Sequence, residues 1–293
     1  MAVSSRKRHD PTFAVAFGGG GARGLAHIHV IDALDELGIR PVAVSGASIG
    51  AIMAAGVSAG MSGQDIRDYA VGNLGNSSEV ASRIWRSRPE TLSDLFKGGM
   101  RLGQFNIERV LRAFLPEDIP ETFEELHIPL KIVATDYFAH REVVFSHGSL
   151  FPALSASAAL PAVFRPIRYQ GRLLIDGGMV NPIPFDLVSE HADIVIAVDV
   201  IGAPEKNDRP PEPGSIELLF GASQIMMESI VALKLQQVRP QILLRPSVSR
   251  FGVLDFLKVE KVMADTAYIK DELKRAIDDA VARFHDEIEP TGL

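Results

Sequence analysis

Two short apolar segments near the start of the chain are each followed by a glycine-rich turn and a helical pattern. Residues 13–17 are all apolar and run directly into Gly18-Gly-Gly-Gly21, after which residues 22–37 place apolar side chains at helical spacing. Residues 41–44 form a second apolar run that reaches Gly46-Ala-Ser-Ile-Gly50 and then a helix of small residues. Apolar strands that alternate with helices are typical of a parallel sheet covered on both faces, so we predict an α/β fold.

Composition excludes several classes of function. The chain has 293 residues, enough for one large domain or two small ones. It carries 30 basic and 37 acidic residues, a net charge of -7, so electrostatic attraction to nucleic acid or to an anionic membrane is not expected. Because cysteine is absent, disulfides, thiolate metal sites and cysteine nucleophiles are excluded. Any catalysis must use oxygen or nitrogen groups.

The rest of the chain continues the alternation after a helical excursion over residues 62–126. Hydropathy and turn residues predict strands at 130–134, 143–146, 173–175, 194–200 and 242–244, and helices at 151–160, 185–189, 216–237 and 264–288. A loop rich in Pro, Glu and Asp is predicted over 202–214. The sequence contains no internal repeat.

Three segments have more than one interpretation. Residues 1–11 are predicted to be a loose tail, because the apolar stretch after them is too short for a signal peptide. Residues 41–64 are uncharged and long enough to span a membrane, but they are rich in Ala, Gly and Ser and lack aromatic anchors, so a buried strand and helix explain them better. Helix 216–237 has a broad apolar face, which favours a packing helix over a lid or an interfacial helix.

The motif Gly46-Ala-Ser48-Ile-Gly50 is the strongest indication of chemistry. G-x-S-x-G between a buried strand and a helix is the context of a nucleophile elbow, in which a tight turn exposes the serine hydroxyl. Glycines are needed beside the serine because a side chain would not fit. The following helix directs its first N–H groups, including that of Ile49, toward a developing oxyanion. The alternative is a packing turn rich in Gly and Ser.

The glycine run after the first strand has two interpretations. Gly19, Gly21 and Gly24 match G-x-G-x-x-G, the dinucleotide fingerprint, but the acidic ribose partner expected about 20 residues later is replaced by the elbow. We therefore assign Gly19, Gly20 and Gly21 to an oxyanion hole. Arg23 is either a surface charge on a helix or a group that fixes this loop and attracts a substrate phosphate.

An acidic residue ends the predicted strand at 173–175. Asp176 is followed by Gly177 and Gly178, and this placement favours contact with another loop at the same sheet edge over an ordinary Asp-Gly turn. A Ser, acid, His triad would need a histidine after Asp176, and only His191 and His285 are available, both in polar surroundings. If neither acts as base, Asp176 accepts the serine proton directly.

Three blocks resemble the patatin-like phospholipases: Gly19-Gly-Gly-Ala-Arg-Gly24, Gly46-Ala-Ser-Ile-Gly50 and Asp176-Gly-Gly178, in this order. The resemblance covers roughly residues 13–200, and residues 155–166 and 176–184 are similar to the bacterial branch related to the neuropathy target esterases. It implies a three-layer α/β/α patatin-like fold with a central mainly parallel sheet. It also implies a single catalytic domain over 12–293, with the motifs within 13–200 and a C-terminal helical extension over 215–293.

The same resemblance implies a set of roles. Ser48 would be the nucleophile and Asp176 the proton acceptor, with a glycine-rich oxyanion loop and with no catalytic histidine, metal or cofactor. The motif residues are Arg23, Gly24, Gly46, Gly50, Gly177 and Gly178. The loop opens with Gly18 where plant members have aspartate, a departure that leaves the predicted oxyanion donors untouched.

The predicted function is a serine acyl hydrolase of lipid esters, of the phospholipase A, lysophospholipase or carboxylesterase type, acting through a covalent acyl-enzyme. Its partner is a lipid ester, with transient contact to membranes or micelles, in a cytoplasmic protein that can be peripheral to the membrane. One rival is a regulatory or ligand-binding protein on the same fold with weak or vestigial esterase activity. A nicotinamide or flavin binder is a third interpretation, disfavoured by the missing ribose partner.

Overall fold

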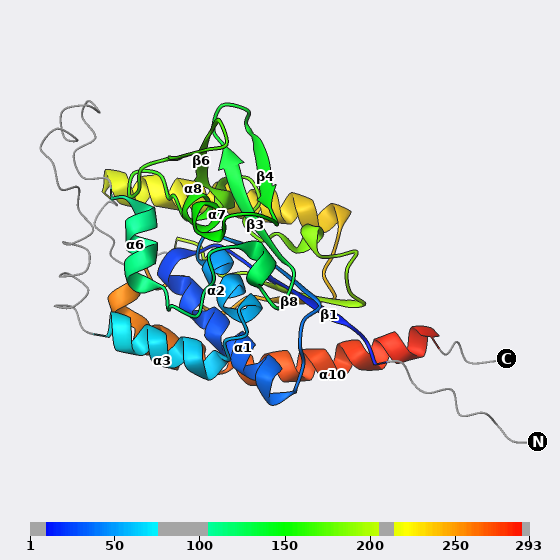
Figure 1. The fold of residues 1–293 in the computed structure, drawn as a ribbon. Helices are drawn as coiled ribbons and strands as arrows, with labels where there is room; N and C mark the ends of the chain where they lie inside the picture. Colours follow the sequence, from blue (N-terminus) through cyan, green and yellow to red (C-terminus); the bar gives the residue numbers. More distant parts are fainter. Residues whose placement is uncertain (1–9, 76–104, 205–213, 289–293) are drawn as a thin grey trace, which may run out of the picture.

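The computed structural model of the protein describes residues 10–75, 105–204 and 214–288, and in these residues a single sheet forms the centre of the molecule (Figure 1). The sheet has eight strands in the order β5-β6-β3-β2-β1-β7-β8, and β4 pairs with β3 off this path. The strands are β1 (Phe13–Phe17), β2 (Ala43–Ala47), β3 (Leu130–Asp136), β4 (Arg141–Phe145), β5 (Ile167–Tyr169), β6 (Arg172–Asp176), β7 (Ile194–Val198) and β8 (Ile242–Leu244).

The strands at the centre of the sheet pair in parallel, and those on one side of it pair antiparallel. β3, β2, β1, β7 and β8 are parallel to their neighbours in this order. β4 and β6 are antiparallel to β3, and β5 is antiparallel to β6. The structure therefore confirms the predicted α/β class with a mixed, mostly parallel sheet.

Helices follow most of the strands. The α-helices are α1 (His27–Glu36), α2 (Ile49–Ser58), α3 (Gly63–Leu74), α6 (Ile107–Phe114), α7 (Leu150–Ser157), α8 (Ser215–Gln237), α9 (Val259–Thr266) and α10 (Ile269–Ile288). Short 3-10 helices lie at Gly21–Ala26, Phe123–Glu125, Gly177–Met179, Phe185–Leu187 and Phe256–Lys258.

Two hydrophobic cores lie on opposite faces of the sheet. Along β1, Val15 and Phe17 pack into a large core with α1, α2, α7 and α10, while Ala14 and Ala16 face a smaller core with residues 183–188 and Val231 of α8. This alternation follows from the two-residue period of a strand. Figure 1 shows the result, with α8 on one side of the sheet and α1, α3 and α10 on the other. Both faces of the sheet are covered, as the apolar strands require.

Several predicted boundaries differ from the structure. The helix predicted over 22–37 begins as a 3-10 helix and becomes α1 only at His27, and the closing helix is divided into α9 and α10. Residues 185–189 form only a short 3-10 helix. The membrane-span alternative for 41–64 is wrong, because this segment contains β2 and α2, which are both buried in the core. The part of the predicted excursion over 76–104, with Trp85, lies outside the described residues.

The long helix α8 packs on the protein by one side only. Gln224 and Val231 are buried, and Lys234 donates to the carbonyl of Ile183 at 3.1 Å. Apolar side chains on its outer side are exposed: Leu218, Leu219, Ile225, Met226 and Leu233. By length and composition Glu217–Gln237 could cross a membrane, which alone is weak evidence, and 17% of its most apolar window is buried. The prediction of a packing helix therefore holds only for the side of α8 that carries Gln224 and Val231.

Candidate active site

Ser48 occupies a strained turn between β2 and α2. Its φ of 54° and ψ of -127° lie in a region that residues with side chains rarely adopt. A Cβ at Gly46 would collide with the carbonyl oxygen of Gly50, and a Cβ at Gly50 would collide with that of Phe17. The two glycines of the motif are therefore required by the close approach of the strand, the turn and the helix.

The register of the sheet brings Asp176 to Ser48. In β2 and β3, Ala47 pairs with Val133, and in β3 and β6, Ala134 pairs with Asp176. The end of β2 and the end of the antiparallel strand β6 therefore lie at the same level on either side of β3. The hydroxyl of Ser48 donates to Oδ2 of Asp176 at 2.6 Å, across 128 residues of sequence.

The carboxylate of Asp176 is held by several groups and shielded from water. The N–H of Gly178 donates to Oδ1 at 2.8 Å, and the Thr135 hydroxyl donates to the Asp176 carbonyl at 2.8 Å. The side chain is 2% exposed. Burial raises the pKa of Asp176 to about 6, and the hydrogen bonds from Ser48 and Gly178 oppose the rise. A carboxylate with this pKa is ionised at pH 7 yet basic enough to take a proton.

The glycines on either side of this pair lie against neighbouring backbone or side chains. A Cβ at Gly177 would collide with the Val133 carbonyl, and one at Gly178 would lie 3.0 Å from the Met227 methyl group of α8. A Cβ at Gly24 would collide with Ile49, so the 3-10 helix after the glycine loop packs tightly on the start of α2. These contacts hold the glycine loop, the elbow and the acid together.

The predicted oxyanion donors fall into two groups. A Cβ at Gly19 would lie 3.3 Å from the Cβ of Ser48, so this loop is next to the nucleophile. The N–H of Gly19, however, donates to the carbonyl of Pro182 at 2.9 Å, which corrects the expectation that it is an oxyanion donor. Within the described part of the chain, the N–H groups of Gly20, Gly21 and Ile49 have no acceptor. These three groups remain the predicted oxyanion donors.

Gly20 and Gly21 also need the absence of a side chain. A Cβ at Gly20 would collide with the carbonyl of Val200, and one at Gly21 would collide with that of Val253. Gly21 has a φ of 61°, in the left-handed region that favours glycine. The loop is therefore packed between Val200, just after β7, and the loop that contains Val253.

Arg23 fixes the glycine loop from inside the protein. It is 5% exposed, which excludes the surface-charge alternative. Its Nε donates to the carbonyl of Phe251 at 2.7 Å, and its Nη1 donates to the carbonyl of Ile201. Burial lowers its pKa to about 10, opposed by Asp255, so the guanidinium remains charged at neutral pH. These contacts agree with the predicted role of Arg23 in fixing the glycine loop. They give no support to its predicted attraction of a substrate phosphate.

Two residues that contact Ser48 or the glycine loop were not predicted as part of the site. The hydroxyl of Ser157, in α7, accepts the N–H of Ser48 at 2.9 Å. His27 is fully buried, and its Nε2 lies 2.9 Å from the carbonyl of Gly18, so Nε2 must carry the proton. Burial lowers the pKa of His27 to about 4, although the bond to Gly18 opposes this. For Ser157 the available signal was a hydroxyl group in a helix of mostly small and apolar residues. For His27 there was none, because α1 also carries other polar residues.

The two histidines considered as bases do not reach the pair. His191 is exposed and lies 3.4 Å from Nζ of Lys131, and His285 packs edge-on against Phe284 in α10 with ring centroids 5.7 Å apart. Among the described residues, neither forms a hydrogen bond with Ser48 or Asp176. The hydroxyl and the carboxylate contact each other without an intervening imidazole.

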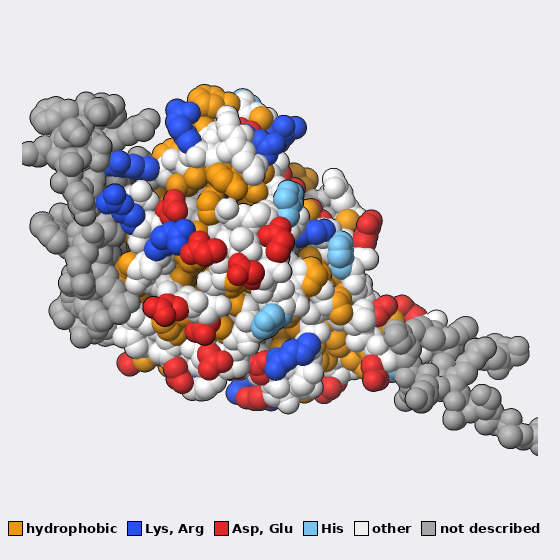
Figure 2. All heavy atoms as spheres, in the orientation of Figure 1, with side chains coloured by type: hydrophobic (Ala, Val, Ile, Leu, Met, Phe, Trp, Pro, Cys, Tyr) orange, Lys and Arg blue, Asp and Glu red, His pale blue; other side chains and the backbone are white. Residues whose placement is uncertain are grey.

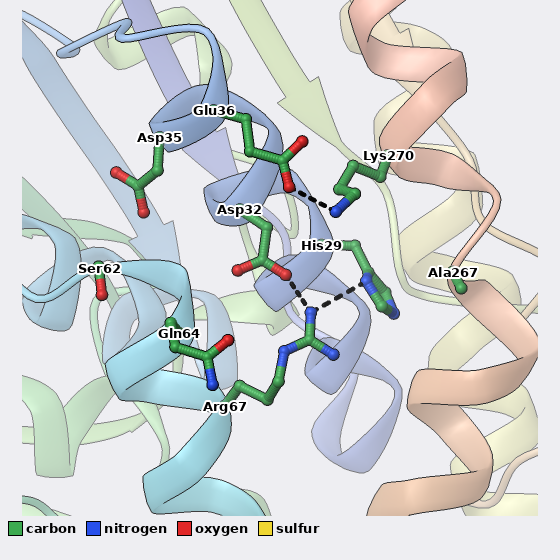
Figure 3. A pocket seen from close by; sticks show the side chains of 9 residues that line it. All are labelled: His29, Asp32, Asp35, Glu36, Ser62, Gln64, Arg67, Ala267 and Lys270. Carbon is green, nitrogen blue, oxygen red and sulfur yellow. Dashed lines mark hydrogen bonds and ion pairs between the residues drawn. The ribbon is translucent and has the colours of Figure 1, made fainter.

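A cavity of about 570 Å³ lies away from these loops, between α1, the start of α3 and the start of α10 (Figure 3). Four of its charged groups form two ion pairs, Arg67 with Asp32 and Lys270 with Glu36 at 2.6 Å, and Asp35 pairs with Arg40 outside the cavity. The lining residues are His29, Asp32, Asp35, Glu36, Ser62, Gln64, Arg67, Ala267 and Lys270. None of them belongs to the loops that carry the serine, the acid or the glycine run.

Comparison with known proteins gives a family match and several relatives. The profile of the family described as patatin-like phospholipase matches residues 15–189. An uncharacterized NTE family protein of Mycobacterium tuberculosis is 36% identical over 213 residues, 72% of this chain and 55% of the relative. Patatin-like phospholipase domain-containing protein 6 of Homo sapiens is 34% identical over 204 residues, 67% of this chain and 14% of that protein. The chain thus spans about half the length of the first mycobacterial relatives.

Solved structures with some similarity include two proteins. VipD from Legionella pneumophila has a TM-score of 0.46 and 16% identity, covering 90% of this chain and 67% of VipD. Human GIVD cytosolic phospholipase A2, in complex with methyl gamma-linolenyl fluorophosphonate, has a TM-score of 0.42 and 14% identity, covering 94% of this chain and 59% of the enzyme. Similarity at this level supports no conclusion about function.

Proposed function

Because this chain belongs to the patatin-like phospholipase family, we propose that it hydrolyses carboxylic esters of lipids through a covalent acyl-enzyme on Ser48. The observation that carries the proposal is the 2.6 Å hydrogen bond from the Ser48 hydroxyl to the buried Asp176 carboxylate. A serine hydroxyl becomes an effective nucleophile when an adjacent base takes its proton, and Asp176 is the base in contact with it.

The first half of the proposed reaction forms the acyl-enzyme. Ser48 Oγ attacks the ester carbonyl while its proton passes to Oδ2 of Asp176. The negative charge on the former carbonyl oxygen is stabilised by the N–H groups of Gly20, Gly21 and Ile49, which are free to donate. The tetrahedral intermediate then collapses, the bond to the alcohol oxygen breaks, and the alcohol leaves with the proton from Asp176.

The second half restores the enzyme. Water attacks the acyl carbonyl and gives a proton to Asp176, and the acid leaves as Ser48 recovers its proton. Asp176 is suited to both directions because its pKa, raised to about 6 by burial, lies close to neutral pH. A hydrogen bond from the N–H of Gly178 keeps the carboxyl group in place, and one from the Thr135 hydroxyl to the main-chain carbonyl of Asp176 holds its backbone.

Intact-mass analysis tests this function even though the lipid that the protein acts on is unidentified. The protein is exposed to a mixed extract of cell lipids, and we expect an acyl adduct that maps to Ser48. The Ser48→Ala variant is the control and should remain unmodified. An adduct that persists in this variant, or a folded wild-type protein that neither acylates nor reacts with a fluorophosphonate, would contradict the proposal and favour the regulatory alternative.

A further inference from the structure

The hairpin between β3 and β4 carries two exposed aromatic side chains at its turn. Tyr137 is 53% exposed and Phe138 is 70% exposed, the latter the largest value among the exposed large hydrophobic side chains described. Their rings pack edge-on with centroids 5.2 Å apart. Oδ1 of Asp136 accepts the N–H groups of Phe138 and Ala139 at 3.2 and 3.1 Å, so the turn is held in shape. The aromatic pair is presented on an ordered tip.

Three arginines lie on the strands of this side of the sheet. Arg141 begins β4 opposite Asp136, while Arg168 and Arg172 lie on the neighbouring strands β5 and β6. Arg141 and Arg168 are exposed and make no ion pair within the described part of the chain, and Arg172 lies 3.9 Å from Asp136. Figure 2 shows hydrophobic side chains at the upper end of the molecule with Lys or Arg on both sides. Against these three arginines stand the carboxylates of Asp136 and Glu142, so the tip has a local excess of one positive charge although the whole chain is acidic.

The tip lies at the same end of the sheet as the Ser48 and Asp176 pair. Ala134 of β3 pairs with Asp176, and Tyr137 is three residues further along the same strand direction. At about 3.3 Å per residue, the turn stands about 10 Å beyond the level of the carboxylate. Headgroup layers are roughly 5–8 Å thick on each side of a bilayer. A tip seated at that depth would hold the serine close to the membrane surface.

The outer side of α8 adds apolar surface beside the hairpin. Asn181 connects the two elements, because it accepts from Lys234 of α8 and donates to Glu142 of β4 at 2.7 Å. Met227, on the inner side of α8, faces Gly178 next to the acid. The exposed side carries apolar residues at Leu218, Leu219, Ile225, Met226 and Leu233. The outer side of α8 therefore offers exposed apolar surface to an acyl chain.

We propose that the tip formed by Tyr137 and Phe138, with Arg141, Arg168 and Arg172 around it, docks the protein on bilayers that contain anionic phospholipids, an inference that rests on the proposed lipid ester hydrolysis. Aromatic rings favour the interface between headgroups and acyl chains. Guanidinium groups pair with headgroup phosphates, and each basic residue near an anionic surface strengthens binding. Docking therefore uses local charge as well as apolar surface, which revises the expectation drawn from the net charge of -7.

Vesicle flotation of the full chain tests the docking. We expect the wild type to float with vesicles of phosphatidylcholine and phosphatidylglycerol, and the Tyr137→Ser/Phe138→Ser variant to bind about tenfold more weakly or worse. The matched control is Leu37→Ser/Val42→Ser, which removes two side chains of 40% and 41% exposure from the segment between α1 and β2, at the end of β2 away from Ser48. Equal binding by the tip variant, or an equal loss in the control, overturns the proposal.

A second pair of variants tests the charges. Arg141→Gln/Arg168→Gln should weaken binding to the anionic vesicles about tenfold and leave binding to pure phosphatidylcholine vesicles unchanged. Added salt should reduce wild-type binding in the same selective way. Binding that depends on neither lipid charge nor salt would overturn the role of the arginines. If the wild type sediments as a dimer and the tip variant as a monomer, the surface binds a second copy of the chain and not a bilayer.

Hydrolysis of a soluble short-chain ester separates this docking from the proposed function. The wild type and the tip variant should hydrolyse such an ester equally, while only the wild type should be accelerated by anionic vesicles. If the wild type hydrolyses the soluble ester but does not bind vesicles, the docking proposal is wrong and the proposed hydrolase function still stands. If it binds vesicles through the tip but reacts with neither ester nor fluorophosphonate, the proposed hydrolase function is wrong and the docking surface still stands.

Discussion

The hydroxyl of Ser48 and the carboxylate of Asp176 are 2.6 Å apart, at the ends of two strands that lie on either side of β3. Ser48 holds a positive φ of 54°, and Asp176 is 2% exposed. The one residue is strained and the other desolvated, and both conditions cost stability. Both costs can be measured separately from activity.

The strain at Ser48 should be visible in two inactive variants. Ser48→Ala and Ser48→Gly both lack the hydroxyl, so both should lose at least about a thousandfold in kcat/KM on a p-nitrophenyl ester. Only glycine relaxes the left-handed backbone, so Ser48→Gly should be more stable than Ser48→Ala by about 1 kcal/mol in urea denaturation. Equal stabilities would show that the turn is not strained.

The raised pKa of Asp176 predicts opposite effects of pH on activity and stability. Below pH about 6 the carboxyl group is protonated, so log kcat/KM should fall with a slope near one as the pH decreases. A raised carboxyl pKa stabilises the fold most below the ordinary value of 3.8, and this contribution is lost as the pH rises through about 6. Asp176→Asn removes the buried charge and should be inactive, yet more stable than the wild type at pH 8 by about 1–3 kcal/mol.

Thermal denaturation across pH 4 to 8 checks this, with the difference between Asp176→Asn and the wild type as the measured quantity. The difference should vanish toward pH 4. A wild type that gains stability relative to Asp176→Asn between pH 4 and 7 would contradict the raised pKa.

The glycine loop should tolerate no side chain where backbone approaches it. Gly20→Ala places a methyl group against the carbonyl of Val200, so we expect a loss of about 2–4 kcal/mol in the free energy of unfolding and a loss of activity. Gly72 lies in α3 with no atom within 4 Å of its added Cβ. Gly72→Ala is therefore the control, and should stabilise the protein by about 0.5–1 kcal/mol without changing kcat. A Gly20→Ala protein of normal stability would refute the close packing.

His27 should act as a positioning residue for the glycine loop. His27→Phe keeps an aromatic ring beside Phe17 but loses the bond to the Gly18 carbonyl, so kcat on a soluble ester should fall about tenfold with little change in KM. His285→Phe, on α10, is the control and should retain full activity.

The pH dependence of stability tests whether burial holds His27 neutral. The pKa of His27 is lowered to about 4, so its contribution to stability is present above the ordinary value of 6.5 and is lost as the pH falls through about 4. We expect His27→Phe to lose less stability than the wild type between pH 6.5 and 4. An identical pH profile in the two proteins would mean that His27 titrates normally and is not held neutral by burial.

Much of the fold was predictable because apolar periodicity is local. The strands at residues 13–17 and 242–244 were predicted with the bounds that the structure has. β2 begins and ends later than predicted, at Ala43–Ala47, because its hydrogen-bonding register with β1 extends the strand into the glycine motif. β5 was not predicted, since its three residues are paired only with β6 and carry no apolar run of their own.

The sequence by itself determined the chemistry that is available: an elbow at Ser48, an acid at the end of a strand, glycines beside both, and no cysteine. Only the tertiary structure decided which groups meet. The sheet register places Asp176 against Ser48. The carbonyl of Pro182 accepts the N–H of Gly19. The carbonyls of Ile201 and Phe251 accept hydrogen bonds from the buried Arg23. Hydropathy patterns report which face of an element is buried, whereas hydrogen-bond partners distant in sequence depend on how the packed elements are arranged.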